Sequence, residues 1–307
     1  MKKIALAILL ILVLILLIIY LFPFPRASFE ELFSRVDEET VQSLQTFRRE
    51  TPVKQLELNG RSWEYVVVGD GPETILFLHG MTGAYDIWWQ QINALSPDYR
   101  VIALTYPPAA GLESLAGGVI AILDAEQVAE ANVVGSSLGG YLAQYLVAHY
   151  PERVKRAVFA NTFPPNDIIA GKNKRIGSLL PFLPEWVVMN VLKKSTEENI
   201  YPAAGYSELV RAYMLEQANG RMSKAQFLAR FQSVIDPFTL PDLAQSGIPV
   251  MIIEADNDPL VEPALREMLK ETYPPAIVQT LPNAGHFPYL NEPAMYTSLL
   301  REFFESE

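Results

Sequence analysis

The stretch "GSSLGG", residues 135–140, places two serines between glycines, and one of them has the spacing of a nucleophile. Ser137 has Gly135 two residues before it and Gly139 two residues after it, which satisfies G-x-S-x-G, whereas Ser136 has no glycine at either position. A serine on a sharp strand-to-helix turn has a strained backbone, so the residues two before and two after it must be small. A glycine-rich turn with serine as the N-cap of a helix gives a similar pattern. The assignment of Ser137 therefore depends on a partner elsewhere in the chain.

A serine hydroxyl is a weak nucleophile unless a base takes its proton, and the chain offers three histidines. His149 ends the helix expected after Ser137, about 18 Å along its axis, which is too far away. His79 directly follows an expected strand, in "HGMTG". His286, in "AGHFPYLNEP", follows the last expected strand and comes just before the last helix. This position makes His286 the predicted base.

Three acidic residues in "VMIIEADNDPLVEP" could complete a triad, since the chain order Ser, Asp or Glu, His is one of those observed. Glu254 still lies inside the strand pattern and is expected to be structural. Asp258 stands just past the strand end, where a loop can reach His286. We therefore predict that Asp258 holds the tautomer of the imidazole and stabilises the imidazolium, with Asp256 as the alternative.

These residues lie at the ends of short apolar runs that alternate with helical patterns. Strands are predicted at residues 54–58, 62–68, 74–78, 100–106, 131–135, 154–162, 248–256 and 276–282, and helices at 85–95, 112–128, 138–149, 260–272 and 289–304. Continuous apolar strands alternating with helices indicate the α/β class, with a mainly parallel sheet covered on both faces. Residues 163–237 lack a strand pattern and are expected to form a helical lid inserted between two strands.

The expected lid contains a run of apolar residues with two interpretations. It could line a pocket for an acyl chain, or it could form the core of the lid packed on the edge of the sheet. The run consists of Leu179, Leu180, Phe182, Leu183, Trp186, Val187 and Val188.

The N-terminal residues 1–25 are predicted to be a membrane anchor. Residues 4–22 form a stretch of nineteen residues without a charge, which as a helix is long enough to cross a bilayer. A cleaved signal peptide usually has a shorter apolar region of about 7–15 residues and a small-x-small exit, whereas "YLFPFPRAS" follows here. An uncleaved anchor is therefore favoured over a cleaved signal.

Charges on either side of the apolar stretch predict its orientation. Lys2 and Lys3 precede it, so the positive-inside rule places the N-terminus in the cytoplasm and the rest of the chain in the periplasm or outside the cell. Residues 26–52 are expected to form an amphipathic linker helix, and residues 53–307 the folded domain.

Composition excludes several classes of function. A net charge of −11 argues against a nucleic-acid partner, because phosphate contacts need clustered Lys and Arg. The chain has no cysteine, which removes disulfides, thiolate catalysis and cysteine-based metal sites. Its three histidines show no HExxH spacing, so no metal site is expected.

Four motifs follow one another as they do in a known family. "HGMTG", "GSSLGG", "NDPLVEP" and "AGHFPYLNEP" stand at predicted strand ends, and over residues 53–305 the chain resembles the α/β-hydrolases. The resemblance implies an oxyanion hole formed by the backbone N–H groups of Met81 and Leu138, and no cofactor. A serine at position 137 excludes the dehalogenase and epoxide-hydrolase branches, which carry aspartate there.

Within the family, "GSSLGGYLAQ", "ANTF" and "HFPYL" resemble the maspardin-like branch, some of whose members are regarded as interaction proteins with incomplete triads. The predicted function is that of a membrane-anchored serine hydrolase. It would cleave an ester, amide or thioester of a small-molecule or lipid-like acyl substrate through an acyl-enzyme. The alternatives are a tethered binding or scaffold module, and carbon–carbon bond hydrolysis or perhydrolysis by the same residues.

Overall fold

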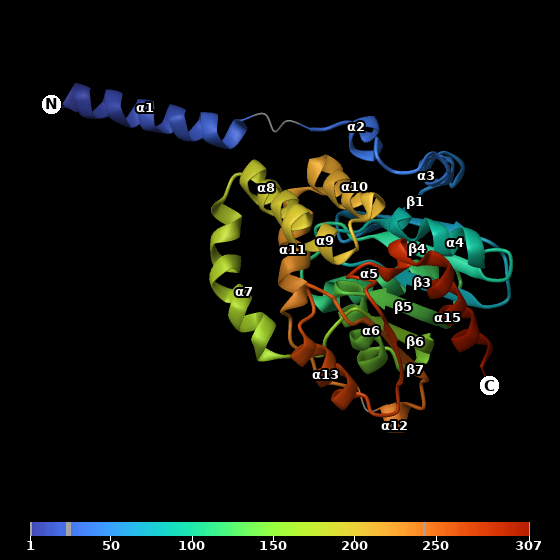
Figure 1. The fold of residues 1–307 in the computed structure, drawn as a ribbon. Coiled ribbons are helices and arrows are strands. Elements are labelled where there is room, and N and C mark those ends of the chain that lie inside the picture. The colour runs from blue at the N-terminus through green and yellow to red at the C-terminus, as the bar shows by residue number, and fades with distance from the viewer. Residues whose placement is uncertain (1, 23–25, 242, 307) are drawn as a thin grey trace.

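The computed structural model describes residues 2–22, 26–241 and 243–306, and its strands form one sheet (Figure 1). The strand order is β1-β2-β4-β3-β5-β6-β7-β8. The bounds are β1 Lys54–Leu58, β2 Arg61–Val68, β3 Thr74–Leu78, β4 Arg100–Thr105, β5 Ala131–Ser136, β6 Val154–Ala160, β7 Val250–Ala255 and β8 Ile277–Leu281. Each strand predicted from the sequence is present.

The sheet is parallel from β4 through β8, and β1 and β2 pair antiparallel at one edge. Strands β3, β5 and β7 are buried at every residue, as their unbroken apolar runs indicate. The predicted α/β class is confirmed. Because parallel strands end at one edge of a sheet, the loops that follow β3, β5, β6, β7 and β8 meet there.

Helices cover both faces of the sheet. Leu112–Ala125 (α5), Leu138–His149 (α6) and Pro263–Thr272 (α13) pack on one face, and Trp89–Leu95 (α4) and Pro293–Glu305 (α15) pack on the other. Two predicted helices are subdivided. Residues 85–95 begin with a 3₁₀ turn, and residues 289–304 form the short α14, Pro288–Asn291, followed by α15. Pro293 starts α15 because proline lacks the N–H that a helix interior needs.

The segment expected to be one linker helix forms two helices. These are α2, Phe29–Phe33, capped by Ser28, and α3, Glu38–Glu50, capped by Asp37. Each cap accepts a backbone N–H and thereby starts a new helix, so the pattern breaks between them. Three side chains of this segment are buried in the same hydrophobic core as those of α4: Phe33, Leu44 and Phe47. The segment therefore packs on the folded domain.

A buried charge cluster fixes α3 to the rest of the fold. Asp86 is fully buried and accepts hydrogen bonds from Arg48 Nε at 2.6 Å, Arg221 Nη1 at 2.7 Å and the Tyr213 hydroxyl at 2.6 Å. Burial alone raises the pKa of Asp86, but the positive charges of Arg221 and Arg48 outweigh it and hold that pKa at about 2. Arg48 also forms a two-pronged salt bridge with Glu216. This cluster joins α3 to the helices inserted before β7.

Between β6 and β7 the described chain is helical, and we call residues 163–237 the lid segment. Its main helices are α7 Asp167–Leu179, α8 Glu185–Ser195, α10 Glu208–Glu216 and α11 Lys224–Val234, with a short α9 at Tyr201–Ala203; α12, Leu243–Ser246, follows it. Leu180, Val188, Met222 and Phe227 form a small core of its own. In Figure 1 α8 lies beneath the end of the N-terminal helix, and α7 runs along the outer side of α11.

The N-terminal helix α1, Lys2–Leu21, extends away from the body in Figure 1, and only its last turn lies near α8. Among the described helices it alone is long and apolar enough to cross a membrane, a property that signal sequences share, and none of it is buried.

Candidate active site

Ser137 stands on a strained turn between β5 and α6. Its backbone angles, φ 55° and ψ −118°, lie in a region that residues with a side chain rarely adopt. A Cβ atom on Gly135 would lie 2.1 Å from the carbonyl oxygen of Gly139, and one on Gly139 would lie 2.0 Å from that of Leu78. Both glycines are therefore required by the close approach of strand and helix, as the G-x-S-x-G spacing predicts.

Asp258 and His286 form a buried pair. Nδ1 of His286 lies 2.9 Å from Oδ1 and 2.8 Å from Oδ2 of Asp258, although 28 residues separate them. The carboxylate also accepts the N–H of Leu260 at 2.8 Å, the N–H of Val261 at 3.1 Å and Nδ2 of Asn161 at 2.9 Å. Burial raises the pKa of Asp258, but the charge and hydrogen bond of His286, with the bonds from Asn161 and Leu260, outweigh it and lower the pKa. Asp258 is therefore ionised.

Asn161 supports this pair, although it is not among the site residues predicted from the sequence. It follows β6 with a positive φ of 43°, a conformation that asparagine tolerates better than most residues. Its Nδ2 donates to Asp258 and, at 3.3 Å, to the carbonyl of Gly285 beside His286. A polar residue directly after a parallel strand, in "ANTF", is the signal that could have found it.

The remaining acidic and histidine candidates lie elsewhere. Glu254 is buried in β7 and accepts from Lys270 and Thr280. Asp256 is exposed and accepts the N–H of Asn283 at 2.7 Å. His149 is exposed at the end of α6. No hydrogen bond joins any of them to His286 within the described residues.

The loop after β3 passes beside Ser137. A Cβ on Gly80 would lie 3.2 Å from the Cβ of Ser137. The ring of the fully buried His79 accepts the Tyr106 N–H at Nε2, at 3.3 Å, so its Nδ1 carries the proton and donates to the Gly80 carbonyl at 2.6 Å. That carbonyl belongs to the same peptide unit as the N–H of Met81. The bond therefore fixes the direction of the predicted oxyanion donor, while the other predicted donor, the N–H of residue 138, starts α6.

Arg230 of α11 holds the same loop from the lid side. The residue is 1% exposed, and its guanidinium donates to the carbonyl oxygens of Met81 at 2.8 Å, Gly83 at 3.0 Å and Tyr106 at 2.9 Å. No described carboxylate forms a salt bridge with it. Burial lowers the pKa of Arg230 to about 10, which leaves it a cation at neutral pH. Burial also lowers the pKa of His79 far below its usual value, and the charge of Arg230 lowers it further.

Ser137 and His286 line one cavity of about 430 Å³ beneath the lid segment. Gly80 and Met81 of the loop after β3 also line it. Most other lining residues are apolar, including Phe163, Leu180, Val188, Val191, Phe227 and Phe287. The cavity thus places a hydroxyl and an imidazole against a space suited to an apolar ligand.

The apolar run of the lid segment is divided by this cavity. Leu180 and Val188 line it, whereas Leu179 and Phe182 are 63% and 73% exposed. Leu179 and Phe182 therefore fit neither of the two interpretations of the run. The run divides in this way because a helix presents successive residues to different sides.

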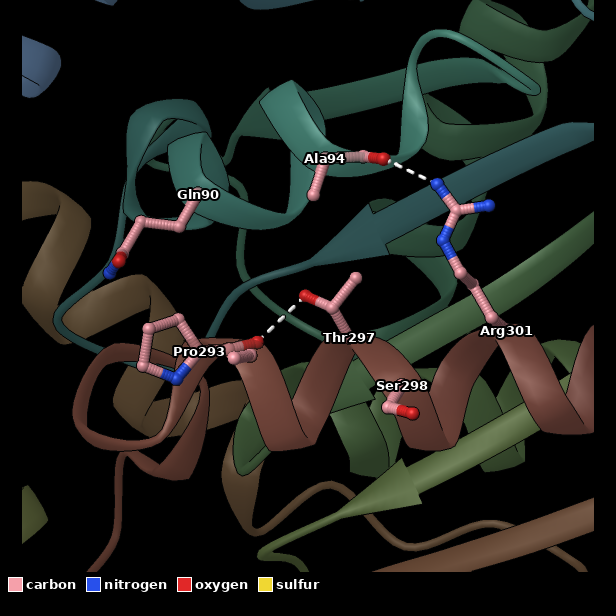
Figure 2. Close-up of a pocket in the computed structure, with 7 residues that line it drawn as sticks. Gln90, Ala94, Pro293, Thr297, Ser298 and Arg301 are labelled. Atoms are coloured by element: carbon pink, nitrogen blue, oxygen red, sulfur yellow. Dashed lines mark hydrogen bonds between the residues drawn. The ribbon is translucent and has the colours of Figure 1, made fainter.

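A second hollow, between α4 and α15, has different chemistry. Figure 2 shows it lined by Gln90, Ala94, Pro293, Thr297 and Arg301. Its volume is about 390 Å³. The drawn hydrogen bonds use Thr297 and Arg301 to hold backbone carbonyls of α15 and α4. The described residues that line this hollow do not include a nucleophile paired with a base. In the described part of the chain, no three side chains of the metal-binding types gather at one point.

The fold and the residues of this site are those of a known protein family. The chain matches the alpha/beta hydrolase family over residues 75–297 and therefore belongs to it. It is 29% identical to maspardin of Danio rerio over 257 residues, which cover 80% of this chain and 79% of that protein. The predicted likeness to the maspardin-like branch is confirmed.

Solved structures show the same fold. A hydrolase from Pseudomonas aeruginosa PA01 superposes with a TM-score of 0.71 at 21% identity, over 83% of this chain and 98% of that one. A bacterial membrane phospholipase A superposes with a TM-score of 0.67 at 18% identity, over 99% of this chain and 98% of that one.

Proposed function

We propose that this protein is a serine hydrolase that cleaves an ester, amide or thioester bond through a triad of Ser137, His286 and Asp258. One observation carries the proposal. A serine on a strained turn and a histidine hydrogen-bonded to a buried, ionised carboxylate line the same apolar cavity.

Each group has a defined role in the proposed reaction. The hydroxyl oxygen of Ser137 attacks the acyl carbonyl while Nε2 of His286 takes its proton. The ionised Asp258 keeps the Nδ1 proton of His286 in place and stabilises the imidazolium that forms. The oxyanion accepts hydrogen bonds from the N–H groups of Met81 and Leu138.

The imidazolium then gives its Nε2 proton to the leaving group, and an acyl-enzyme remains on Ser137. Water attacks this acyl group with His286 again as the base. The acid product leaves, and the serine hydroxyl is restored.

The proposal includes an uncleaved membrane anchor formed by α1. Its 20 residues rise about 30 Å, which matches the hydrocarbon core of a bilayer. Lys2 and Lys3 favour a cytoplasmic N-terminus, which places the domain in the periplasm or outside the cell. The likeness to the bacterial membrane phospholipase A, which extends over 99% of this chain, supports both the anchor and an acyl substrate that is lipid-like or small.

A fluorophosphonate probe and a panel of short and long p-nitrophenyl esters test the proposal on the full chain in detergent. The parent protein is expected to be labelled and to hydrolyse esters, and Ser137→Ala is expected to lose both. Unchanged labelling of Ser137→Ala would show that Ser137 is not the nucleophile. A parent without labelling or hydrolysis would favour a scaffold, and labelling without hydrolysis across the panel would favour carbon–carbon bond cleavage.

A further inference from the structure

Three large apolar side chains of the lid segment face solvent close together in the sequence. Leu179 at the end of α7, Phe182 after it and Val191 in α8 are 63%, 73% and 60% exposed. We call these three residues the lid surface. Several large exposed apolar side chains on one short segment are expected where another apolar phase covers the surface.

The lid surface is connected to the end of α1. Nε1 of Trp186 donates to the carbonyl oxygen of Ile19 at 2.9 Å, and the hydroxyl of Tyr20 donates to the carbonyl oxygen of Phe182. Because α1 ends at Leu21, the Ile19 carbonyl is one of the last four that lack a partner inside the helix. Trp186 therefore caps α1 from the lid segment.

This contact fixes the height of the lid surface relative to a membrane. A helix of 20 residues uses its whole length to cross the hydrocarbon core, so the last turn of α1 reaches the far interface. Trp186 and Tyr20 belong to the residue types that concentrate at such interfaces. Figure 1 shows α7 and α8 at the edge of the body on the side toward which α1 extends.

The lid surface also borders the cavity. Val191 is 60% exposed and at the same time lines the cavity that holds Ser137 and His286. Leu180, which directly follows Leu179, lines it as well. The mouth of the cavity therefore opens beside the lid surface.

We propose that the lid surface rests in the bilayer that carries α1, and that the acyl chain of a membrane lipid ester passes from that bilayer into the cavity beside Val191. This inference rests on the proposed serine hydrolase and its anchor. Ser137 attacks the ester carbonyl, the lipid alcohol leaves with the proton from His286, and water then releases a fatty acid from the acyl-enzyme.

Contact with the bilayer is testable without catalysis, because the chain has no cysteine. In phosphatidylcholine vesicles, Phe182→Cys is labelled with the fluorophore NBD. Met295→Cys, on α15 and 47% exposed, is the matched control. We expect a blue shift and strong quenching by nitroxide lipids for position 182, and neither for 295. A label at 182 that lipids do not quench would overturn the inference. A blue shift that instead grows with protein density would do so as well, and would indicate a second copy as the cover.

Substrate access is tested separately with the variant Leu179→Asp/Phe182→Asp, two residues that do not line the cavity. We expect at least a tenfold lower hydrolysis of a fluorogenic phosphatidylcholine in vesicles, with hydrolysis of soluble p-nitrophenyl butyrate in detergent within twofold of the parent. Met295→Asp is expected to change neither. Equal hydrolysis of the lipid by parent and variant would contradict the proposal. A parent that hydrolyses neither substrate would refute the serine hydrolase, while the NBD result would still report on the membrane contact.

Discussion

Asp258→Asn keeps the shape of the side chain and removes its charge, so it isolates what the carboxylate contributes. An amide nitrogen at the Oδ1 position would face two backbone N–H donors, those of Leu260 and Val261. At the Oδ2 position it would face one side-chain donor, Asn161. The amide nitrogen therefore takes the Oδ2 position, which lies 2.8 Å from Nδ1 of His286.

The size of the effect follows from the lost charge. A carboxylate about 4 Å from the imidazolium charge stabilises it by about 4 kcal/mol at an effective dielectric constant of about 20. That energy corresponds to a roughly 10³-fold lower kcat. An NH₂ group against Nδ1 also favours the wrong imidazole tautomer, and the same substitution in a serine-protease triad lowers kcat about 10⁴-fold. We expect a decrease between these values with KM little changed, because Asp258 does not line the cavity.

Steady-state kinetics with p-nitrophenyl butyrate measure both constants, and thermal unfolding shows that the variant is folded. Asp256→Asn is the matched control, since Asp256 is exposed two residues away and its side chain accepts only the Asn283 N–H among the described groups. Its kcat is expected to stay within twofold of the parent. An Asp258→Asn protein that keeps more than about a tenth of the parent kcat would show that the charge of Asp258 does not stabilise the imidazolium by this amount.

Three further outcomes are expected. Gly139→Ala places a Cβ 2.0 Å from the carbonyl oxygen of Leu78 and is expected to lower both the Tm and the phosphonate labelling. Gly117→Ala, whose Cβ would meet no atom within 4 Å, is expected to lower neither. Scanning fluorimetry measures the Tm, and gel fluorescence measures the labelling. Arg230→Lys cannot hold three carbonyls at once, so kcat is expected to fall about 10–100-fold with KM nearly constant, and an unchanged kcat would exclude a positioning role. Because the pKa of Asp86 is lowered from 3.8 to about 2, its stabilising effect is present above pH 4 and lost as the pH falls toward 2. In urea unfolding between pH 7 and pH 2, Asp86→Asn should therefore remove about 2 kcal/mol of the pH dependence, and an equally steep curve would contradict this.

The parts of the site that the sequence could predict are those with a local steric or positional rule. Gly135 and Gly139 are required by the close approach of strand and helix, so the motif alone separates Ser137 from Ser136. Asp258 and His286 follow the neighbouring parallel strands β7 and β8, and the ends of parallel strands meet at one edge of the sheet. Both residues could therefore be predicted to lie near Ser137, although each is more than a hundred residues away from it along the chain.

The parts that could not be predicted depend on how distant segments pack. Arg230 lies in a lid helix whose docking no local pattern reveals, and its partners are backbone carbonyls, which every residue carries. The apolar run of the lid segment could be recognised, but the side that each residue faces depends on the path of α7 and α8. The packing of Phe33 and Leu44 into the core could not be predicted for the same reason. An amphipathic pattern shows which face of a helix is buried, but not which element that face packs against.

The proposed function depends above all on Ser137 as the nucleophile. The most direct measurement is mass spectrometry of the phosphonylated full-length protein, with fragment spectra that separate the two neighbouring serines. We expect the phosphonyl group on Ser137, which lines the cavity, and none on Ser136, which is fully buried. Modification of Ser136 or of any other residue, with Ser137 unmodified, would show that Ser137 is not the nucleophile.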